Sequence, residues 1–309
     1  MIAAITLNVS VDRKYIVENA RTGAVNRVKE CVATAGGKGL NVTRIISALG
    51  EQVVAGGIVG GNLGNFVCQQ LDAQRIGHRF THAAGETRCC INICDGATGD
   101  QTEYLEPGLT VSPDEEAAFL RDYRELCARC SVITLSGSLP RGLEKDTYAK
   151  LIRIAAEAGR PVLLDASGDA LAQGIAANPY YIKPNEDEIG TLYPCDTGKI
   201  EEVAAGAMKL VEGGVQRAVV SMGREGALLA CSEGVFLGKP PVIRAVNTVG
   251  CGDAMTAAFA IAAEKKMPPA DAMKYAVAVS AASALHPLTG GVDPKKVHEL
   301  WPQVTVRRM

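Results

Sequence analysis

Short apolar strands alternate with helices over the middle of this 309-residue chain, and this alternation constrains the fold more than any other feature. The capping sequence Ser112-Pro113-Asp114-Glu115 begins the first of these helices. The expected strands are 132–135, 162–165, 180–182 and 218–220, and the expected helices include 147–158 and 203–211. Strands joined by helices of this length form a parallel sheet that is covered on both faces. We therefore expect an α/β fold in one domain, without a linker or repeat.

Polar or glycine-rich residues follow nearly every expected strand. The first strand, 2–7, ends at Asn8-Val9-Ser10-Val11-Asp12, and later strands end in the segments 136–140, 183–188 and 221–226. In α/β sheets, ligands bind beside the carboxyl ends of the strands. The sequence therefore predicts a binding site along one edge of the sheet. Asp12 can bind sugar hydroxyls there, although a turn aspartate is equally consistent with the sequence.

The segment Asn247-Thr248-Val249-Gly250-Cys251-Gly252-Asp253 precedes the apolar run 254–263. This run predicts a buried helix whose first turn, Gly250 to Gly252, has backbone N–H groups without partners inside the helix. Such groups attract anionic oxygen. Asp253 lies beside them and can accept a proton from an attacking hydroxyl. The combination predicts phosphoryl transfer to an alcohol, and the alternative is a turn with a capping aspartate.

Three glycines surround Lys38 in the segment Ala35-Gly36-Gly37-Lys38-Gly39-Leu40-Asn41-Val42, which opens a helix that stops at Gly50. Glycines around a lysine at a helix start predict a site for an anion or a polyol. The segment is not a P-loop, because that pattern needs glycine at Val32 and a hydroxyl at Gly39. Arg88, in a later β segment, is a candidate phosphate ligand; an ordinary surface arginine is the alternative.

Two short segments with alternating polarity, 15–17 and 26–32, are separated by Arg21-Thr22-Gly23. They predict exposed strands rather than core strands. A small β flap that projects from a larger sheet fits this pattern. Such a flap needs a ligand or a partner to cover it.

Several function classes are disfavoured. The formal net charge of -2 and the pI near 6.1 argue against a nucleic-acid surface. The glycines of 53–64 lack the Gly-x-Gly-x-x-Gly spacing of a nicotinamide site. The apolar run 254–263 is too short to span a bilayer, and no signal peptide is visible. The ten cysteines are expected to be reduced, and Cys127-x-x-Cys130 has no second pair to complete a zinc site.

Taken together, these segments resemble the PfkB family of ribokinase-like carbohydrate kinases over the whole chain. The matching segments are AGGKGLNVTRIISALG (35–50), LSGSLPRG (135–142), LDASGDAL (164–171), IKPNEDEI (182–189), VVSMGREGALL (219–229) and NTVGCGD (247–253). Within the family, the chain is most similar to the phosphosugar branch that contains 1-phosphofructokinase and tagatose-6-phosphate kinase. The resemblance implies one kinase domain, 1–309, built as a three-layer α/β/α sandwich with a mostly parallel sheet. It also implies a small β lid formed by segments within about 12–34 and 87–106.

The resemblance assigns roles on the nucleotide side. Asp253 is the implied catalytic base, and the backbone amides of Gly250, Cys251 and Gly252 are the implied anion hole for the γ-phosphoryl group. The positions that match the ATP-binding and magnesium-binding region are Lys183, Asn185 and Glu188, of which Asn185 and Glu188 hold the metal, partly through water. The positions that match the nucleotide loops are Ser221, Gly223, Gly226 and Thr248. The implied cofactor is Mg²⁺ with ATP, and a monovalent cation such as K⁺ is common among relatives.

On the sugar side, the matching positions are Asp12, Gly37, Lys38 and Asn41, with Arg88, Ser138 and Lys38 on the existing phosphate of the substrate. Arg27, on the lid, matches a residue that relatives present to the neighbouring subunit, so the resemblance implies a homodimer through the lid. The implied reaction is ATP-dependent conversion of D-fructose 1-phosphate to D-fructose 1,6-bisphosphate in the cytoplasm. The alternatives are D-tagatose 6-phosphate or another sugar as acceptor and, from a different class, a non-catalytic sugar or nucleotide sensor.

The chain departs from the phosphosugar pattern near the expected site. Asn8-Val9-Ser10 stands where the branch usually has Asn-Pro-Ala, so proline does not fix φ at this turn. Cys90 stands where the branch has asparagine in Thr-Arg-x-Asn, which removes an amide near the substrate. Cys251 replaces a common alanine, and its thiol is either a passive small group or a reactive one at a helix N-terminus. These changes preserve the reaction class and leave the sugar open.

Overall fold

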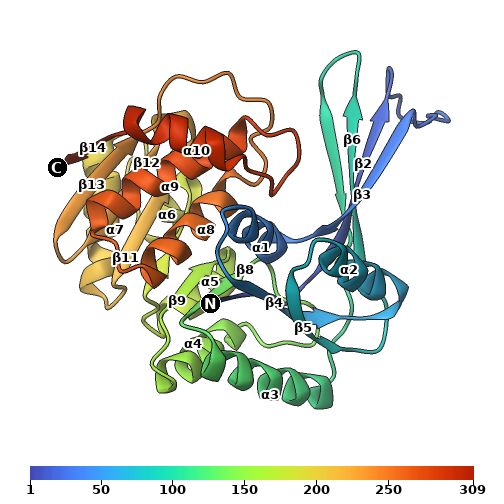
Figure 1. Cartoon of the computed structure of the whole chain (residues 1–309), viewed down its shortest axis with the longest axis horizontal. Helices are drawn as coiled ribbons and strands as arrows, with labels where there is room; N and C mark the ends of the chain where they lie inside the picture. Colours follow the sequence, from blue (N-terminus) through green and yellow to red (C-terminus); the bar gives the residue numbers. More distant parts are fainter.

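The structure is a computed structural model that describes residues 1–309, and a ten-stranded sheet forms its centre (Figure 1). In spatial order the strands are β14 (Thr305–Arg308), β13 (Gly234–Lys239), β12 (Ala227–Cys231), β11 (Arg217–Ser221), β10 (Tyr181–Ile182), β9 (Val162–Asp165), β8 (Val132–Ser136), β1 (Ile2–Thr6), β4 (Val53–Val59) and β5 (Gly77–His82). From β11 to β5, all neighbouring strands are parallel. The expected α/β fold with a mostly parallel sheet is confirmed.

The other edge of this sheet is antiparallel, which the sequence analysis did not predict. Strands β11 to β14 pair antiparallel in succession. Only the short 3₁₀ helix η1 (Gly223–Glu225) separates β11 from β12. A parallel connection needs a crossover of a dozen or more residues, so the chain turns back here instead. Gly226, at φ 96°, makes this turn in the left-handed region.

Helices cover both faces of the large sheet (Figure 1). One hydrophobic cluster contains residues of α1 (Lys38–Ala48), α8 (Cys251–Glu264), α9 (Pro269–Ala284) and α10 (Pro294–Leu300). The other contains residues of α3 (Pro113–Arg129), α4 (Thr147–Glu157), α5 (Gly168–Ile175), α6 (Glu186–Leu192) and α7 (Ile200–Glu212). Strand β1 shows how the sequence divides them: Ile2 and Ala4 belong to the first cluster, Ala3 and Ile5 to the second. Successive side chains of a strand point to opposite faces, so both faces of β1 are apolar.

Helix α8 is the most deeply buried helix next to the expected site. Its residues Ala254, Ala257 and Ala258 have no exposed surface, and these small side chains let α1 and α9 pack closely against it. Phe259 of α8 packs on Tyr181 of β10, with ring centroids 5.0 Å apart. Nearer the start of α8, Thr256 donates to Asp165 at the end of β9, so the helix is held against the carboxyl end of that strand. No helix combines the length and the hydropathy that crossing a membrane requires.

A separate four-stranded sheet projects from the body of the molecule (Figure 1). Its order is β3 (Glu30–Gly36), β2 (Ser10–Val17), β6 (Arg88–Asp95) and β7 (Gln101–Leu105). The base of this sheet packs on α2 (Gly61–Ala73). One further short element, η2 (Trp301–Gln303), follows α10 near the end of the chain.

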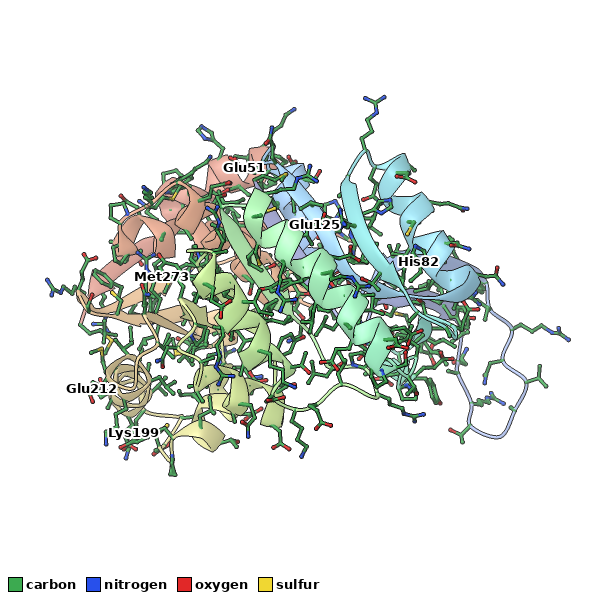
Figure 2. All side chains as sticks on the ribbon, turned by 90° about the horizontal axis from the view of Figure 1, so that it is seen from below. Glu51, His82, Glu125, Lys199, Glu212 and Met273 are labelled. Atoms are coloured by element: carbon green, nitrogen blue, oxygen red, sulfur yellow. The ribbon has the colours of Figure 1, made fainter.

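Strands are predicted at 15–17 and 26–32, and the second of these predictions is partly wrong. Residues 26–29 belong to a loop. The Asn26 side chain accepts from the Arg21 N–H and donates to the Arg21 carbonyl, which closes this segment into a turn instead of an extended strand. Figure 2 shows this loop extending beyond the rest of the molecule.

Candidate active site

The N-terminus of α8 presents free backbone N–H groups. Gly250 caps the helix with φ 86°, a left-handed conformation that favours glycine. A Cβ on Gly250 would also lie 3.0 Å from the Thr289 methyl group. The backbone N–H groups of Gly250, Gly252 and Asp253 have no acceptor in the protein. The N–H group of Cys251 donates to the backbone carbonyl of Thr248 at 3.3 Å. Free N–H groups at the positive end of a buried helix can bind the oxygens of a phosphoryl group.

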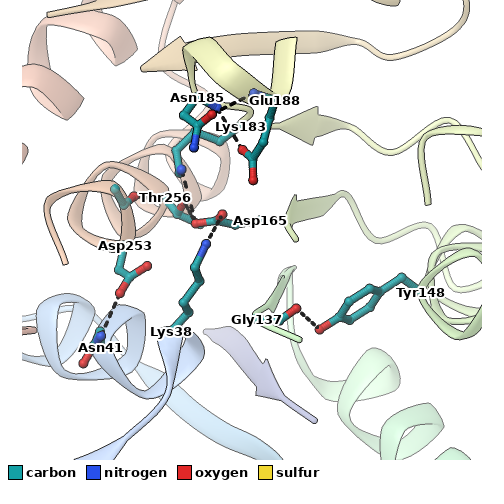
Figure 3. Close-up of polar contacts among 11 residues, drawn as sticks. Lys38, Asn41, Gly137, Tyr148, Asp165, Lys183, Asn185, Glu188, Asp253 and Thr256 are labelled. Carbon is teal, nitrogen blue, oxygen red and sulfur yellow. Dashed lines mark hydrogen bonds and ion pairs between the residues drawn. The ribbon is translucent and has the colours of Figure 1, made fainter. Parts of the chain in front are cut away.

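Asp253 lies in the first turn of α8 and is only 5% exposed. The side-chain amide of Asn41, from α1, donates a hydrogen bond of 2.7 Å to its Oδ2 atom (Figure 3). Burial and the negative charge of Asp165 raise the pKa of Asp253 to about 6, against the opposing effects of Lys38, Asn41 and Lys183. A carboxylate with this pKa is mostly ionised at neutral pH and accepts protons more readily than an ordinary aspartate.

Asp165, at the end of β9, joins two lysines of the site. It is 2% exposed and accepts from Lys38 Nζ at 3.1 Å; Lys183 Nζ is 3.5 Å from its other oxygen. Thr256 of α8 donates to the same carboxylate at 3.2 Å. Burial alone would raise the pKa of Asp165, but the charges of Lys183 and Lys38 outweigh it, so the pKa lies below its ordinary value. The same ion pair raises the pKa of Lys38.

Asp165 is not among the candidate residues predicted from the sequence. Its signal was present, because an aspartate ends the otherwise apolar strand Val162–Asp165 and lies in the quoted segment 164–171. A buried carboxylate at the carboxyl end of a parallel strand needs a cationic partner.

Arg88 and Ser138, 50 positions apart in the chain, meet at Asn8. Arg88 donates from Nε to the Asn8 carbonyl at 3.2 Å, and the Asn8 side-chain amide donates to Ser138 Oγ at 3.1 Å. Arg88 also donates from Nη1 to the Glu106 carbonyl at 3.2 Å, which leaves Nη2 free. Lys38 borders this group, since a Cβ on Gly137 would lie 4.0 Å from the Lys38 Cβ. An arginine held by backbone carbonyls, beside a hydroxyl and a lysine, is suited to bind a phosphate.

Asp12 lies on the face of the small sheet that also carries Arg88. Ser10 is in register with Arg88 and Asp12 with Cys90, so these four side chains point to the same face. Ser10 donates to Asp12 Oδ1 at 2.6 Å. A Cβ on Gly36 would lie 2.1 Å from the Asp12 carboxyl carbon, so this close approach requires glycine. Asp12 keeps its Oδ2 atom available to accept from a ligand hydroxyl.

Gly37 precedes α1 as its N-terminal cap, with φ 104°, and Lys38 and Asn41 follow in the first turns of the helix. From this helix start, Lys38 reaches Asp165 and Asn41 reaches Asp253, and each donates a hydrogen bond to the carboxylate (Figure 3). The structure brings these sugar-side candidates together with Asp253. Arg27 is the exception, because it lies in the exposed loop of the small sheet.

The nucleotide-side candidates lie at the ends of β10 and β11. Asn185 and Ser221 form an isolated parallel bridge, which joins the two strand ends, and Gly223 and Gly226 follow in the next turn. Lys183 is 5% exposed, and its Nζ atom would lie 3.2 Å from a Cβ on Gly252. A buried ammonium thus stands directly beside the free N–H groups of α8. Thr248, in the loop before α8, is exposed.

Asn185 and Glu188 form a capping box at the start of α6. The Asn185 side chain accepts from the Glu188 N–H at 2.8 Å, and Glu188 Oε2 accepts from the Asn185 N–H at 2.9 Å. This use of both side chains was not predicted. Glu188 Oε1 has no protein partner and faces the site (Figure 3).

No cluster of three or more acidic, cysteine or histidine side chains is placed to hold a metal. Magnesium is usually held by one or two carboxylates together with substrate phosphates and water. The single free oxygen of Glu188, whose charge acts on Lys38, fits this mode and would supply one ligand to a bound metal. When bound, magnesium neutralises charge on the phosphates.

The Cys251 thiol lies beside Asp253. Burial, with the charge of Asp253, raises its pKa to about 11. A thiol of this pKa is almost fully protonated at neutral pH, so the passive interpretation of Cys251 is favoured over the reactive one.

Three comparisons with known proteins agree over the whole chain. The model of the pfkB family carbohydrate kinases matches residues 5–296. The curated tagatose-6-phosphate kinase of Staphylococcus epidermidis is 37% identical over 309 residues, which is 99% of each protein.

The solved structures also match along their full lengths. Phosphofructokinase-2 from Escherichia coli, in complex with potassium, is 27% identical with a TM-score of 0.91 and covers 98% of each chain. The same enzyme has been solved with fructose 6-phosphate and as a tetrameric inhibited form. A possible 1-phosphofructokinase from Thermotoga maritima is 26% identical with a TM-score of 0.90, covering 100% of this chain and 99% of the other.

Proposed function

The chain belongs to the pfkB family of carbohydrate kinases and is a sugar-phosphate kinase, and we propose that its acceptor is D-fructose 1-phosphate, converted with ATP to D-fructose 1,6-bisphosphate. The observation that carries the proposal is the separation of two functions within one site. Asp253 and the free N–H groups lie on α8, whereas Arg88 and Ser138 converge on Asn8 after β1. A ketohexose phosphate fits this arrangement, because its phosphate can bind at Arg88 and Ser138 while its free primary hydroxyl, at the other end, lies at Asp253.

The mechanism follows from the residues around Asp253. The acceptor hydroxyl donates its proton to Asp253 while its oxygen attacks the γ-phosphorus, and the bond to the bridging oxygen of ADP breaks. The free N–H groups of Gly250 and Gly252, together with Lys183, bind the oxygens on which charge develops. Asp165 keeps Lys38 charged and holds both lysines in place. Asp12 and Asn41 bind the sugar hydroxyls.

D-Tagatose 6-phosphate is the second candidate acceptor. It also carries a phosphate at one end and a free primary hydroxyl at the other. The 37% identity to a tagatose-6-phosphate kinase favours it, and Cys90, beside Asp12 on the same face, is a position where the choice between epimers can be made.

We further propose a lid, a homodimer and the cations that the reaction uses. The small sheet acts as a lid, because its Asp12 and Arg88 face shares the site. Exposed apolar side chains on this sheet and its loop need a cover: Val25, Val28, Val32, Tyr104 and Leu105. A second copy of the chain, contacted through the lid and Arg27, provides it, so a homodimer is proposed. Mg²⁺ with ATP, K⁺ as an activating cation and a cytoplasmic location belong to the same proposal.

Arg88→Met tests the phosphate site. A charge-assisted hydrogen bond to phosphate contributes about 1.5–3 kcal/mol, so KM for the sugar phosphate should rise about 10–100-fold while KM for ATP stays unchanged. Steady-state kinetics with both substrates measures this. Arg153→Met, at an exposed arginine of α4 outside every proposed site segment, is the control and should change neither constant. An equal rise for a non-phosphorylated sugar would contradict the phosphate role.

The pKa of about 6 for Asp253 predicts the acid limb of the pH profile. The base must be ionised, so kcat/KM should fall below pH 6 and level off above it. Sugar phosphates also titrate near pH 6, and Asp165→Asn separates the two causes. Because the charge of Asp165 raises the pKa of Asp253, the limb should move to lower pH in this variant. A limb that stays in place would assign it to the substrate.

A further inference from the structure

Asn41 lies between the proposed base and a partly buried arginine of its own helix. Its Nδ2 atom donates to Asp253 Oδ2 at 2.7 Å, and its Oδ1 atom accepts from Arg44 Nη2. Arg44 is three positions further along α1, which places both side chains on one side of the helix. The mechanism described above uses Asn41 and leaves Arg44 without a role.

The Asn41 side chain has a donor NH₂ group and an acceptor oxygen. Its orientation determines which of the two faces the Asp253 carboxylate. Guanidinium is only a donor, so the amide oxygen must face Arg44. The amide NH₂ group then has to face Asp253. In the reverse orientation, the amide oxygen would oppose the carboxylate, and Asp253 would lose the hydrogen bond that holds its Oδ2 atom. With Oδ2 held, Oδ1 remains free to take the proton.

Arg44 is itself fixed from two further segments. Its Nη1 atom donates to the carbonyl of Ala35 at the end of β3, and its Nη2 atom donates to the carbonyl of Thr289 at 3.4 Å. The loop of Thr289 in turn packs on Gly250, since a Cβ on Gly250 would lie 3.0 Å from the Thr289 methyl group. One guanidinium therefore connects the small sheet, the amide at the base and the loop that borders the anion-binding turn.

We propose that Arg44 is a positioning residue for the phosphoryl transfer, which orients the Asn41 amide and through it directs the free oxygen of Asp253 toward the acceptor hydroxyl. This inference rests on the proposed function only for the identity of the acceptor. Asp253 and Asp12 are the charges that act on Arg44. Asp165 from β9, Lys38 from α1 and Lys183 after β10 are the other charges that act on Asp253.

Kinetics of Arg44→Met provides the first test. Misplacement of a catalytic group by about 1 Å costs roughly 10²-fold, so kcat should fall about 10–100-fold with KM for ATP unchanged. Arg44→Lys should recover part of the loss. Arg160→Met is the matched control, because Arg160 is also partly buried and donates to a backbone carbonyl, that of Cys127, outside the site. The control should keep the wild-type kcat.

A double-mutant cycle separates positioning from a general structural effect. If Arg44 acts through Asn41, Asn41→Leu should lower kcat, and adding Arg44→Met should lower it little further. Losses that multiply in the double variant would overturn the proposal. Thermal unfolding of each variant shows whether it is folded. If Arg44→Met does not fold, the same cycle is measured with Arg44→Lys.

Titration of Asp253 tests the contact without any turnover. In the free protein with ¹³C-labelled aspartate, the Asp253 carboxyl, assigned with Asp253→Asn, should titrate at higher pH in Arg44→Met, because the donor bond from Asn41 and a nearby positive charge are lost. An unchanged titration would overturn the inference. This readout does not depend on the acceptor, so an inactive wild-type protein with a shifted titration would contradict only the proposed function.

Discussion

Asp253→Asn is expected to lower kcat by about 10²–10⁴, the range that general-base catalysis contributes. The amide has the shape of the carboxylate but cannot take the proton of the acceptor hydroxyl. The N–H groups of Gly250 and Gly252 and the ammonium of Lys183 remain, so ATP binding should be unaffected. Turnover by ADP release and nucleotide affinity by calorimetry measure the two effects separately.

The stability of the same variant is its control. The pKa of Asp253 is raised to about 6 in the folded protein from an ordinary 3.8, so the ionised carboxylate lowers stability above pH 6. Removing that charge should leave the free energy of unfolding at pH 8 equal to or above that of the wild type. Loss of turnover in a protein of undiminished stability identifies the base. Wild-type turnover in Asp253→Asn would contradict the assignment.

Asp165→Ala is expected to destabilise the fold by about 3–5 kcal/mol, the cost of removing one partner of a buried ion pair. Lys183 is 5% exposed and would lose its carboxylate partner. Because the pKa of Asp165 lies below its ordinary value of 3.8, the stabilisation is present above that pH and is lost as the pH falls through the folded-state pKa. Denaturant unfolding at pH 7 measures the difference.

Glu299→Ala is the matched control for this prediction. Glu299 pairs with Lys296 at 2.6 Å, but both side chains are about half exposed, so the ion pair contributes little. Similar unfolding free energies for Asp165→Ala and the wild type would show that the Lys183–Asp165 contact does not stabilise the fold.

The parts of the site that depend on local sequence were predicted, and the parts that depend on distant contacts were not. The helix start at Gly250 to Asp253 follows from glycines before an apolar run, and the structure has that helix at Cys251–Glu264. The partner of Lys38 is 127 positions away, at Asp165, and that of Asn41 is 212 positions away, at Asp253. No local pattern encodes such pairs; the strand order that brings them together does.

Two further differences have local causes that the sequence pattern did not distinguish. The segment after Lys183 was expected to serve the metal, whereas Asn185 and Glu188 first satisfy the N-terminus of α6 as a capping box. The Ser-x-x-Glu box at Ser112 was recognised because a long helix follows it, and α6 is shorter. Arg44 was not selected, since a single arginine in an apolar helix gives no signal of what it contacts.

ADP release with Mg-ATP should be measured with each of four acceptors: fructose 1-phosphate, tagatose 6-phosphate, fructose 6-phosphate and ribose. We predict the highest kcat/KM for fructose 1-phosphate and very little turnover of ribose, which lacks the phosphate that Arg88 and Ser138 are proposed to bind. Preference for tagatose 6-phosphate would keep the mechanism and move the specificity to Cys90 and the Asn8–Asp12 turn. The proposed function would be contradicted if ribose were turned over as well as the sugar phosphates. It would also be contradicted if ATP bound tightly but no acceptor gave ADP release.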